Sequence, residues 1–284
     1  MEMEFISALP EDCLSSILCF TSPHDACRLS AVSADFHSVA DSDTVWENFL
    51  PSDYRRIVAD SVPALQFSSK KELYRKLCDS VLVDSGRKRL KLEKLSGKKC
   101  YELSARDLSI TWGSESMYWA WTSLPESRFS EVAVLRTMSW LEIQGKIDTE
   151  MLTPNTKYGA YLVLKISDRA FGLDLMPSEV SVQVGDNEAC RNTAYIRRRE
   201  NSHVEVIQRM MYGNRTELLK SMVVGGGGEG RLPAEREDGW LDIKIGEFFS
   251  GEKSMEVKMG LKEVMGHHLK GGLIVHGIEI RPEN

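Results

Sequence analysis

The sequence predicts an α + β multidomain protein, in which a small helical domain precedes an antiparallel β-sandwich. Apolar residues recur with a helical period through residues 1–50, whereas from residue 100 onward they alternate with a period of two. The chain has 284 residues, of which 42% are hydrophobic, so two domains with a sizeable core are possible. We therefore expect domains at residues 1–50 and 100–284, joined by a helical connector and the start of the sandwich at residues 51–99.

Four short helices are predicted in residues 9–50. A proline at a first helical position and a hydroxyl cap mark two of their starts, at Pro10 and at Ser22. Apolar residues then recur with helical spacing: Leu14, Ile17, Leu18, Ala26, Leu29, Val32, Phe36, Val39, Ala40, Val45, Trp46, Phe49 and Leu50. A unit of about 40 residues rarely holds a sufficient core alone, so its exposed apolar side chains require a partner or a neighbouring domain.

An ordered set of motifs lies in this helical stretch: Leu9-Pro10-Glu11-Asp12, Ile17-Leu18, Ser22-Pro23-His24-Asp25, Val32-Ser33 and Asp43-Thr44-Val45-Trp46. The set resembles an F-box, the helical module that docks on the Skp adaptor of cullin-type ubiquitin ligases. The resemblance implies adaptor-facing or module-packing roles for Leu9, Pro10, Ile17, Leu18, Val32 and Trp46. Periodicity alone leaves open a helical subdomain packed on the rest of the chain.

Composition and charge limit the class of function. A net charge of -6 and an isoelectric point near 5.6 argue against a general nucleic-acid binder, which needs clustered excess Lys and Arg. The six cysteines show no C-x-x-C spacing, and the N-terminus has no signal-peptide pattern. No stretch approaches the roughly 20 apolar residues that cross a bilayer. We expect a reduced, soluble protein of the cytoplasm and nucleus, with neither a membrane nor a nucleic acid as its partner.

The connector is predicted to be helical and then extended. Ser69 and Glu72 have the spacing of a capping box. Apolar residues follow at i, i+4 and i+8, namely Leu73, Leu77 and Val81. The basic stretch 87–99 contains alternating leucines, which favours a solvated strand face over a targeting signal.

Beyond residue 100, six or more short strands are predicted. The alternating residues are Leu141, Ile143 and Ile147; Ala160, Leu162, Leu164 and Ile166; Val180, Val182 and Val184; Leu241, Ile243 and Ile245; Val257, Met259 and Leu261; and Ile274, Ile278 and Ile280. Without helical patterns between them, these strands indicate a sandwich or jelly roll whose two sheets bury their inner faces. Residues 186–239 are assigned to long loops, with a strand or helix around residues 204–211.

Four aromatic residues fall within ten positions: Trp112, Tyr118, Trp119 and Trp121. On a strand, Trp119 and Trp121 share one face and Tyr118 points to the other, so some of these rings should reach solvent. An exposed indole complements the apolar face of a pyranose ring, while carboxylates and amides accept hydrogen bonds from hydroxyls. Sugar binding is one interpretation, and aromatic residues that cap the sandwich core are the other.

Further motifs extend over residues 100–282: Ala105-Arg106-Asp107-Leu108-Ser109-Ile110-Thr111-Trp112, Tyr118-Trp119-Ala120-Trp121, Trp140-Leu141-Glu142-Ile143-Gln144-Gly145-Lys146, Asp238-Gly239-Trp240-Leu241-Asp242-Ile243-Lys244 and Gly277-Ile278-Glu279-Ile280-Arg281-Pro282. They resemble the phloem protein 2 family, which includes a tobacco lectin for N-acetylglucosamine oligomers. The resemblance implies carbohydrate contacts at Trp112, Trp119, Glu256 and Glu263. Val134 and Leu269 depart from the family pattern, where Glu and Trp are common.

No catalytic centre, cofactor or metal site is expected. Glu256 and Glu263 would lie roughly 23 Å apart along an extended strand, whereas glycosidase carboxyl pairs lie about 5 to 9.5 Å apart. Their odd separation also places them on opposite faces of the strand, unless a bulge or turn intervenes. His267-His268 has no Cys or carboxylate neighbours at ligand spacing.

Together, the two resemblances imply a plant F-box protein of the phloem protein 2-B type. Such a protein is a substrate-recognition subunit of a Skp-cullin-F-box ubiquitin ligase. Its F-box binds the Skp-type adaptor and, through it, a cullin, and its jelly-roll-like lectin domain binds a glycan or glycoprotein that contains N-acetylglucosamine. Two alternatives stay open: a sandwich that binds a protein surface and has lost sugar affinity, and a free lectin with an N-terminus of no function.

Overall fold

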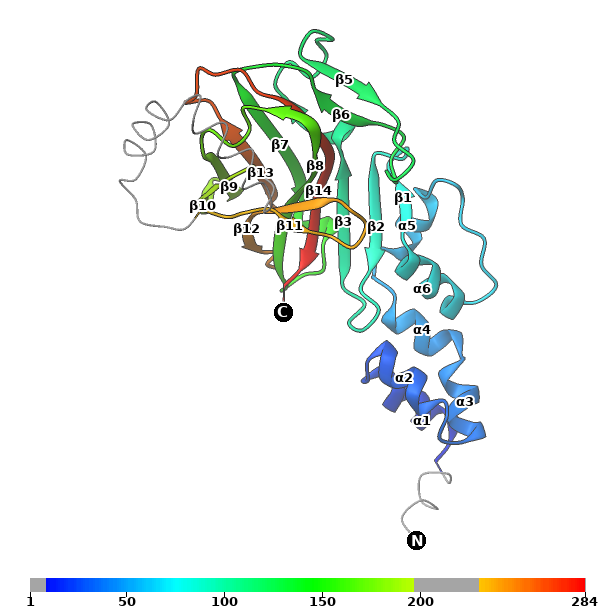
Figure 1. Ribbon diagram of the computed structural model, residues 1–284. Coiled ribbons are helices and arrows are strands. Elements are labelled where there is room, and N and C mark those ends of the chain that lie inside the picture. The colour runs from blue at the N-terminus through cyan, green and yellow to red at the C-terminus, as the bar shows by residue number, and fades with distance from the viewer. Residues whose placement is uncertain (1–8, 197–229, 284) are drawn as a thin grey trace. The chain divides into compact units, whose positions relative to one another are not determined.

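The computed structural model describes residues 9–196 and 230–283. They belong to two compact units, Met1–Tyr101 and Glu102–Asn284. The first unit is rich in helices and the second is built of strands (Figure 1). The α + β class predicted from the sequence is therefore confirmed.

The first unit carries the helices of the described residues and a β-hairpin. Its elements are α1 (Glu11–Cys19), α2 (Pro23–Leu29), α3 (Ala34–Ala40), α4 (Asp43–Phe49), α5 (Tyr54–Ala59), α6 (Lys70–Asp79), β1 (Val81–Val83) and β2 (Lys88–Leu92). Strands β1 and β2 pair antiparallel. Strand β3 (Lys99–Ser104) crosses the boundary between the two units.

Hydroxyl caps start three of these helices. Ser22, Ser33 and Ser69 each accept a hydrogen bond from the backbone N–H three residues later, at 3.1, 3.2 and 3.2 Å. Helix α1 begins at Glu11, one residue later than predicted, because Pro10 has an extended ψ of 149° and serves as the N-cap. The predicted starts of the second helix and of the connector helix are confirmed.

A hydrophobic core holds α1 to α4 together. It consists of Leu14, Leu18, Ala26, Phe36, Val39, Ala40 and Val45, with Cys19, Leu29 and Phe49 packed against it. These are largely the residues whose helical spacing was read from the sequence, so the periodic apolar face of each short helix is the face that is buried.

The end of the connector helix differs from the prediction. Helix α6 ends at Asp79, and Ser80 adopts a φ of 87°, which turns the chain out of the helix. Val81 therefore begins strand β1 instead of continuing the helical face of Leu73 and Leu77. Spacing of i+8 could not reveal this, because the break depends on the conformation of one residue.

The second unit is a sequence of strands with two short 3-10 turns. Its elements are η1 (Ala105–Asp107), β4 (Ser109–Ile110), β5 (Trp119–Thr122), β6 (Val132–Leu135), β7 (Leu141–Asp148), η2 (Thr149–Met151), β8 (Lys157–Phe171), β9 (Ser178–Val184), β10 (Asn187–Ala194), β11 (Ala234–Glu235), β12 (Leu241–Phe249), β13 (Glu256–Glu263) and β14 (Gly271–Pro282). Each predicted alternating run lies in one of these strands.

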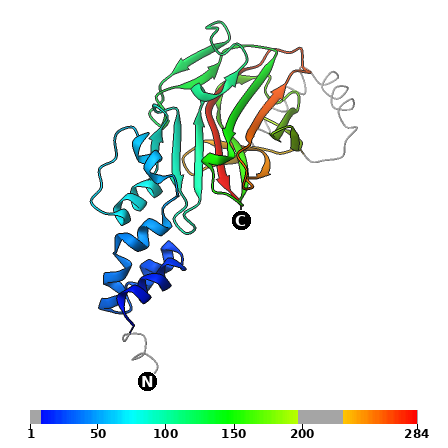
Figure 2. The ribbon, with the colours of Figure 1, turned by 180° about the vertical axis from the view of Figure 1, so that it is seen from behind.

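Two antiparallel sheets form the sandwich (Figures 1 and 2). In the first sheet, β14 pairs with β8, β8 with β12 and β12 with β11, while β6 pairs with both β14 and β5. The second sheet has the order β10-β9-β13-β7-β4. The two sheets approach closely at Gly145 of β7, where an added Cβ would lie 2.9 Å from Cδ1 of Ile278 in β14. This close packing of inner faces defines the sandwich.

Strand β10 corrects the assignment of residues 186–239 to loops. It pairs with β9 from Asn187↔Val184 to Ala194↔Ser178, with one register shift. Polar residues dominate it because it is the edge strand of its sheet, so its sequence lacks the apolar alternation of an inner strand. The element expected around residues 204–211 lies outside the described residues.

Candidate functional site

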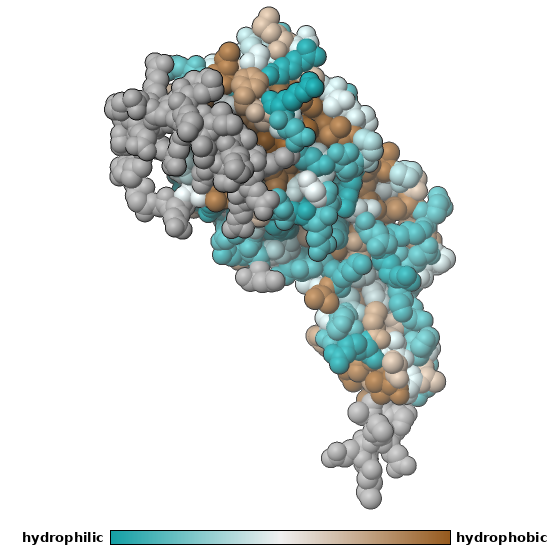
Figure 3. All heavy atoms as spheres, in the orientation of Figure 1, coloured by the Kyte–Doolittle hydropathy of each residue, from teal (hydrophilic) through white to brown (hydrophobic). Residues whose placement is uncertain are grey.

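The helical unit carries large apolar side chains on its surface (Figure 3). The exposed fractions are 38% for Leu9, 46% for Ile17, 93% for Phe20 and 59% for Val32. Phe20 directly follows α1 and was missed in the sequence, although it lies three residues after Ile17. Exposure of this much apolar surface on one small unit is typical of a protein-docking surface. We call these four residues the helical docking patch.

Leu18 and Trp46, which the sequence grouped with the docking residues, lie in the core. Leu18 is fully buried, and Trp46 is 2% exposed. The Trp46 Nε1 donates to the carbonyl oxygen of Ala40 at 2.6 Å, and its ring lies 5.2 Å from that of Tyr74. Both residues therefore pack the module, whereas Pro10 is exposed at the start of α1.

Trp112 is the exposed member of the aromatic cluster. It is 48% exposed and has a φ of 54°, which places it in a tight turn directly after β4. Its ring stacks on Tyr118, with centroids 5.0 Å apart and an interplanar angle of 29°. A ring held in this way offers a flat apolar face to solvent.

Trp119 lies in the core instead of on the surface that the sequence suggested. It is 1% exposed, and its Nε1 donates to the carbonyl oxygen of Thr111 at 3.1 Å. Trp121 donates in the same way to Gly113 at 2.8 Å. The two indoles thus bind the carbonyl groups on either side of Trp112. In this structure Trp119 supports the Trp112 turn and presents no face of its own to a ligand.

Glu256 and Glu263 lie on opposite faces of β13. The pairing of β13 with β7 runs without a register shift from Glu256↔Asp148 to Glu263↔Leu141, and exposed and buried residues alternate along it. The opposite orientation inferred from their odd separation is therefore confirmed. No bulge brings the two carboxylates to one site.

The two glutamates have different surroundings. Glu256 is exposed and pairs with Lys258 at 3.2 Å and Lys146 at 3.6 Å, and the hydrogen bond from Lys258 lowers the pKa of its carboxyl group. Glu263 is buried and forms an ion pair with Lys270. The geometry leaves Glu256 accessible to a ligand and places Glu263 behind the surface.

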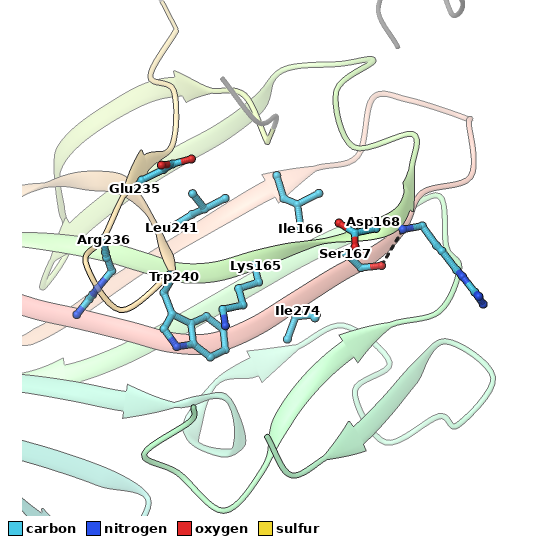
Figure 4. Close-up of a pocket in the computed structure, with 11 residues that line it drawn as sticks. Lys165, Ile166, Ser167, Asp168, Glu235, Arg236, Trp240, Leu241 and Ile274 are labelled. Carbon is cyan, nitrogen blue, oxygen red and sulfur yellow. Dashed lines mark hydrogen bonds between the residues drawn. The ribbon is translucent and has the colours of Figure 1, made fainter. Parts of the chain in front are cut away.

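A cavity of about 770 Å³ lies on the other sheet, beside Lys165 to Arg169 of β8 and the start of β12 (Figure 4). Two of its charged groups are already paired: Lys165 binds Glu126 at 2.8 Å, and Arg236 binds Asp242 at 3.0 Å. The Lys165 Nζ also lies 4.5 Å from the centroid of the Trp240 ring. Trp240 itself is 2% exposed, so this cavity offers little indole surface to a sugar.

Residues 9–196 and 230–283 contain neither a candidate metal site nor a candidate membrane-spanning helix. No group of three or more His, Cys, Asp or Glu side chains is arranged to hold a metal ion there. In the same residues, no helix combines the length and the apolar character needed to span a bilayer.

Comparison with known proteins shows which families and which individual proteins the chain is similar to. A model of the phloem protein 2 family matches residues 98–282, and an F-box-like model matches residues 6–52. Three Arabidopsis thaliana proteins are similar over nearly the full length. They are F-box protein PP2-B13 (49% identical, covering 96% of this chain and 98% of that protein), F-box protein PP2-B15 (48%, 97% and 96%) and F-box protein VBF (47%, 97% and 99%).

Proposed function

The chain belongs to the phloem protein 2 family of F-box proteins, and from this premise we propose that it is a substrate-recognition subunit of a Skp-cullin-F-box ubiquitin ligase. The F-box domain supports binding to a Skp-type adaptor and, through it, to a cullin. The β-sandwich then captures the target. In this role the chain performs no chemistry itself and positions a substrate for enzymes elsewhere in the ligase.

The observation that carries this proposal is the helical docking patch on an F-box-like module. Ile17 and Val32 are 46% and 59% exposed, while Leu14 and Leu18 of α1 are buried in the core of the module. The module therefore has a complete core and an apolar surface in addition, which a partner would cover. We propose that this ligase acts in the cytoplasm and nucleus, where its six cysteines, all free in the structure, stay reduced.

Co-purification of the full chain with a Skp-type adaptor tests the docking role. Ile17→Asp should abolish co-purification, because it places a carboxylate in the centre of an apolar interface. Leu95→Asp is the matched control, since Leu95 is 61% exposed and lies outside the docking patch. Equal adaptor binding by Ile17→Asp and the wild-type chain would contradict the proposal.

For the sandwich, we propose binding of glycans or glycoproteins that contain N-acetylglucosamine. The exposed Trp112 ring, with its face fixed by Tyr118, supports a stacking contact with a pyranose. On a glycan array, the adaptor-bound full chain should bind to chitin-type oligomers.

The alternative is a sandwich that binds a protein surface without sugar affinity. Leu269, 60% exposed where many family members have Trp, favours it. A blank glycan array from a folded, adaptor-bound chain would eliminate the lectin function and leave this alternative.

A further inference from the structure

Trp140 is a second exposed indole, directly before β7. Along β7, Leu141, Ile143 and the other odd-numbered residues are buried, while the even-numbered residues face outward. Trp140 has the same parity as the outward residues and is 41% exposed. The indole therefore lies at the end of the outer face of the β7 sheet, on which Glu142 and Gln144 follow.

The Glu142 carboxylate joins these side chains into one group. Its Oε2 accepts a hydrogen bond from Trp140 Nε1 at 3.2 Å, and its Oε1 accepts one from Gln144 Nε2 at 2.9 Å. These bonds fix the edge of the indole and the plane of the carboxylate. Each carboxylate oxygen keeps a further lone pair, and the Gln144 amide oxygen is a third acceptor. The group thus combines a flat apolar ring with acceptors for hydroxyl groups.

The neighbouring strands leave room beside this group. In β13, Gly260 pairs with Gln144 and Lys262 pairs with Glu142, while in β9, Ser181 pairs with Gly260. Gly260 puts no side chain above the sheet at this point, and Ser181 puts only a short one. The Lys262 Nζ lies 5.9 Å from the centroid of the Trp140 ring and supplies a donor there. Since Lys262 also faces Glu142, no excess of one charge favours an ionic ligand.

One backbone hydrogen bond places the turn of Trp112 beside the start of β7, and further contacts hold the segments around Trp112 and Trp140. The Thr111 N–H donates to the Glu142 carbonyl oxygen at 3.1 Å, which brings the turn of Trp112 beside the start of β7. Trp119 holds the Thr111 carbonyl group from behind. On the other side, Lys270 Nζ, paired with Glu263, donates to the carbonyl oxygen of Ser139 at 2.5 Å, directly before Trp140.

We propose that Trp140, Glu142 and Gln144 form a carbohydrate subsite next to Trp112, and that Trp119 and Glu263 act as positioning residues behind the two exposed indoles. The ligand is a neutral oligosaccharide with acetamido groups. One sugar ring packs its C–H face on Trp140, and its hydroxyl groups donate to Glu142 and Gln144. This inference rests on the glycan binding proposed above and identifies residues that perform it.

The test is binding of triacetylchitotriose to the full chain by titration calorimetry. Trp140→Ala should weaken binding by about tenfold or more, as truncation of a central indole contact does. Trp140→Phe keeps an apolar ring but loses the hydrogen bond to Glu142. Its affinity should therefore fall between that of Trp140→Ala and that of the wild-type chain. Phe249→Ala is the control, because Phe249 is 57% exposed on β12 of the other sheet and should bind as the wild type does.

The possible results distinguish a wrong subsite assignment from an absence of the proposed glycan binding. If the wild-type chain binds chitotriose and both Trp140 variants bind equally well, the subsite assignment is wrong and the glycan function stands. If the folded wild-type chain binds no chitotriose at all, the glycan function falls, and this assignment falls with it. Thermal unfolding of each variant shows that a loss of affinity does not come from a loss of fold.

Discussion

Glu263 and Lys270 form an ion pair inside the sandwich, with side chains that are 4% and 1% exposed. The Glu263 carboxylate also accepts a hydrogen bond from the Gly266 N–H at 3.0 Å. Lys270 in turn binds the carbonyl oxygen of Ser139. The pair therefore ties the loop between β13 and β14 to the segment before β7, and it has no contact surface left for a ligand.

Replacement of Glu263 should destabilise the fold. Glu263→Gln leaves the Lys270 ammonium group buried without its counter-charge, which costs about 3–5 kcal/mol in the free energy of unfolding. Urea unfolding of the full chain measures this loss of stability. Glu256→Gln is the matched control, because Glu256 is exposed on the same strand and its loss should not change the midpoint. An unchanged midpoint for Glu263→Gln would contradict the structural role.

Trp119→Ala should act mainly on stability. Removing a buried indole leaves a cavity and costs about 3–5 kcal/mol, whereas Trp112→Ala should leave the unfolding midpoint nearly unchanged, since Trp112 is 48% exposed. Trp119→Phe retains most of the packing but removes the donor to Thr111. If Trp119→Ala unfolds at the wild-type midpoint and lacks sugar binding, Trp119 contacts the ligand directly.

Substitutions at Leu18 and Ile17, which are adjacent in α1, should affect different properties: the first stability and the second adaptor binding. Leu18→Ala should cost about 2–5 kcal/mol of stability, because Leu18 is fully buried in the helical core. Ile17→Ala should change stability by less than about 0.5 kcal/mol and still weaken adaptor binding. Circular dichroism during thermal unfolding, with adaptor co-purification in parallel, distinguishes them. Equal effects of the two changes on stability would argue against this orientation of α1.

Acid should remove a contribution that Glu247, near the end of β12, makes to the stability of the fold. Hydrogen bonds from Lys157 and Lys244 lower the pKa of Glu247 from 4.5 to about 2. A lowered pKa in the folded state stabilises the protein above pH 4.5, and this contribution is lost as the pH falls towards 2. Because Glu247 is partly exposed, the contribution is below about 1 kcal/mol. Glu247→Gln should therefore be slightly less stable than the wild type near neutral pH.

The pH dependence of unfolding checks this prediction. The difference between Glu247→Gln and the wild-type chain, measured by urea unfolding, should shrink steadily as the pH falls from 4.5 towards 2. A difference that is independent of pH would show that the hydrogen bonds, and not the charge, account for the effect.

Much of the fold could be predicted from local patterns. The caps at Ser22 and Ser69 and the alternation along β7 and β13 are properties of short stretches, and they gave helices and strands at the expected places. Strand β10 was missed because an edge strand needs no apolar alternation. The end of α6 was missed because it depends on the conformation of Ser80.

The candidate site was harder to predict than the fold. The sequence identified Trp112 and Trp119 as a pair of similar residues, yet one is exposed and the other is buried. It gave no sign that Trp140 and Glu142 share a hydrogen bond on the outer face, although their spacing of two places them on one side of a strand. Residue type predicts the chemistry that a side chain can perform, but not whether solvent reaches it.

The sequence by itself determined the two modules, the strand and helix periods and the family of the chain, because these depend on residue types at short spacing. Only the tertiary structure decided which members of each motif face outward. Burial of Leu18, Trp119 and Glu263 results from packing between elements distant in the chain, as in the contact of Glu263 with Lys270. Local periodicity contains no information about that packing, so the surface that meets a partner emerges only when the sheets and helices are assembled.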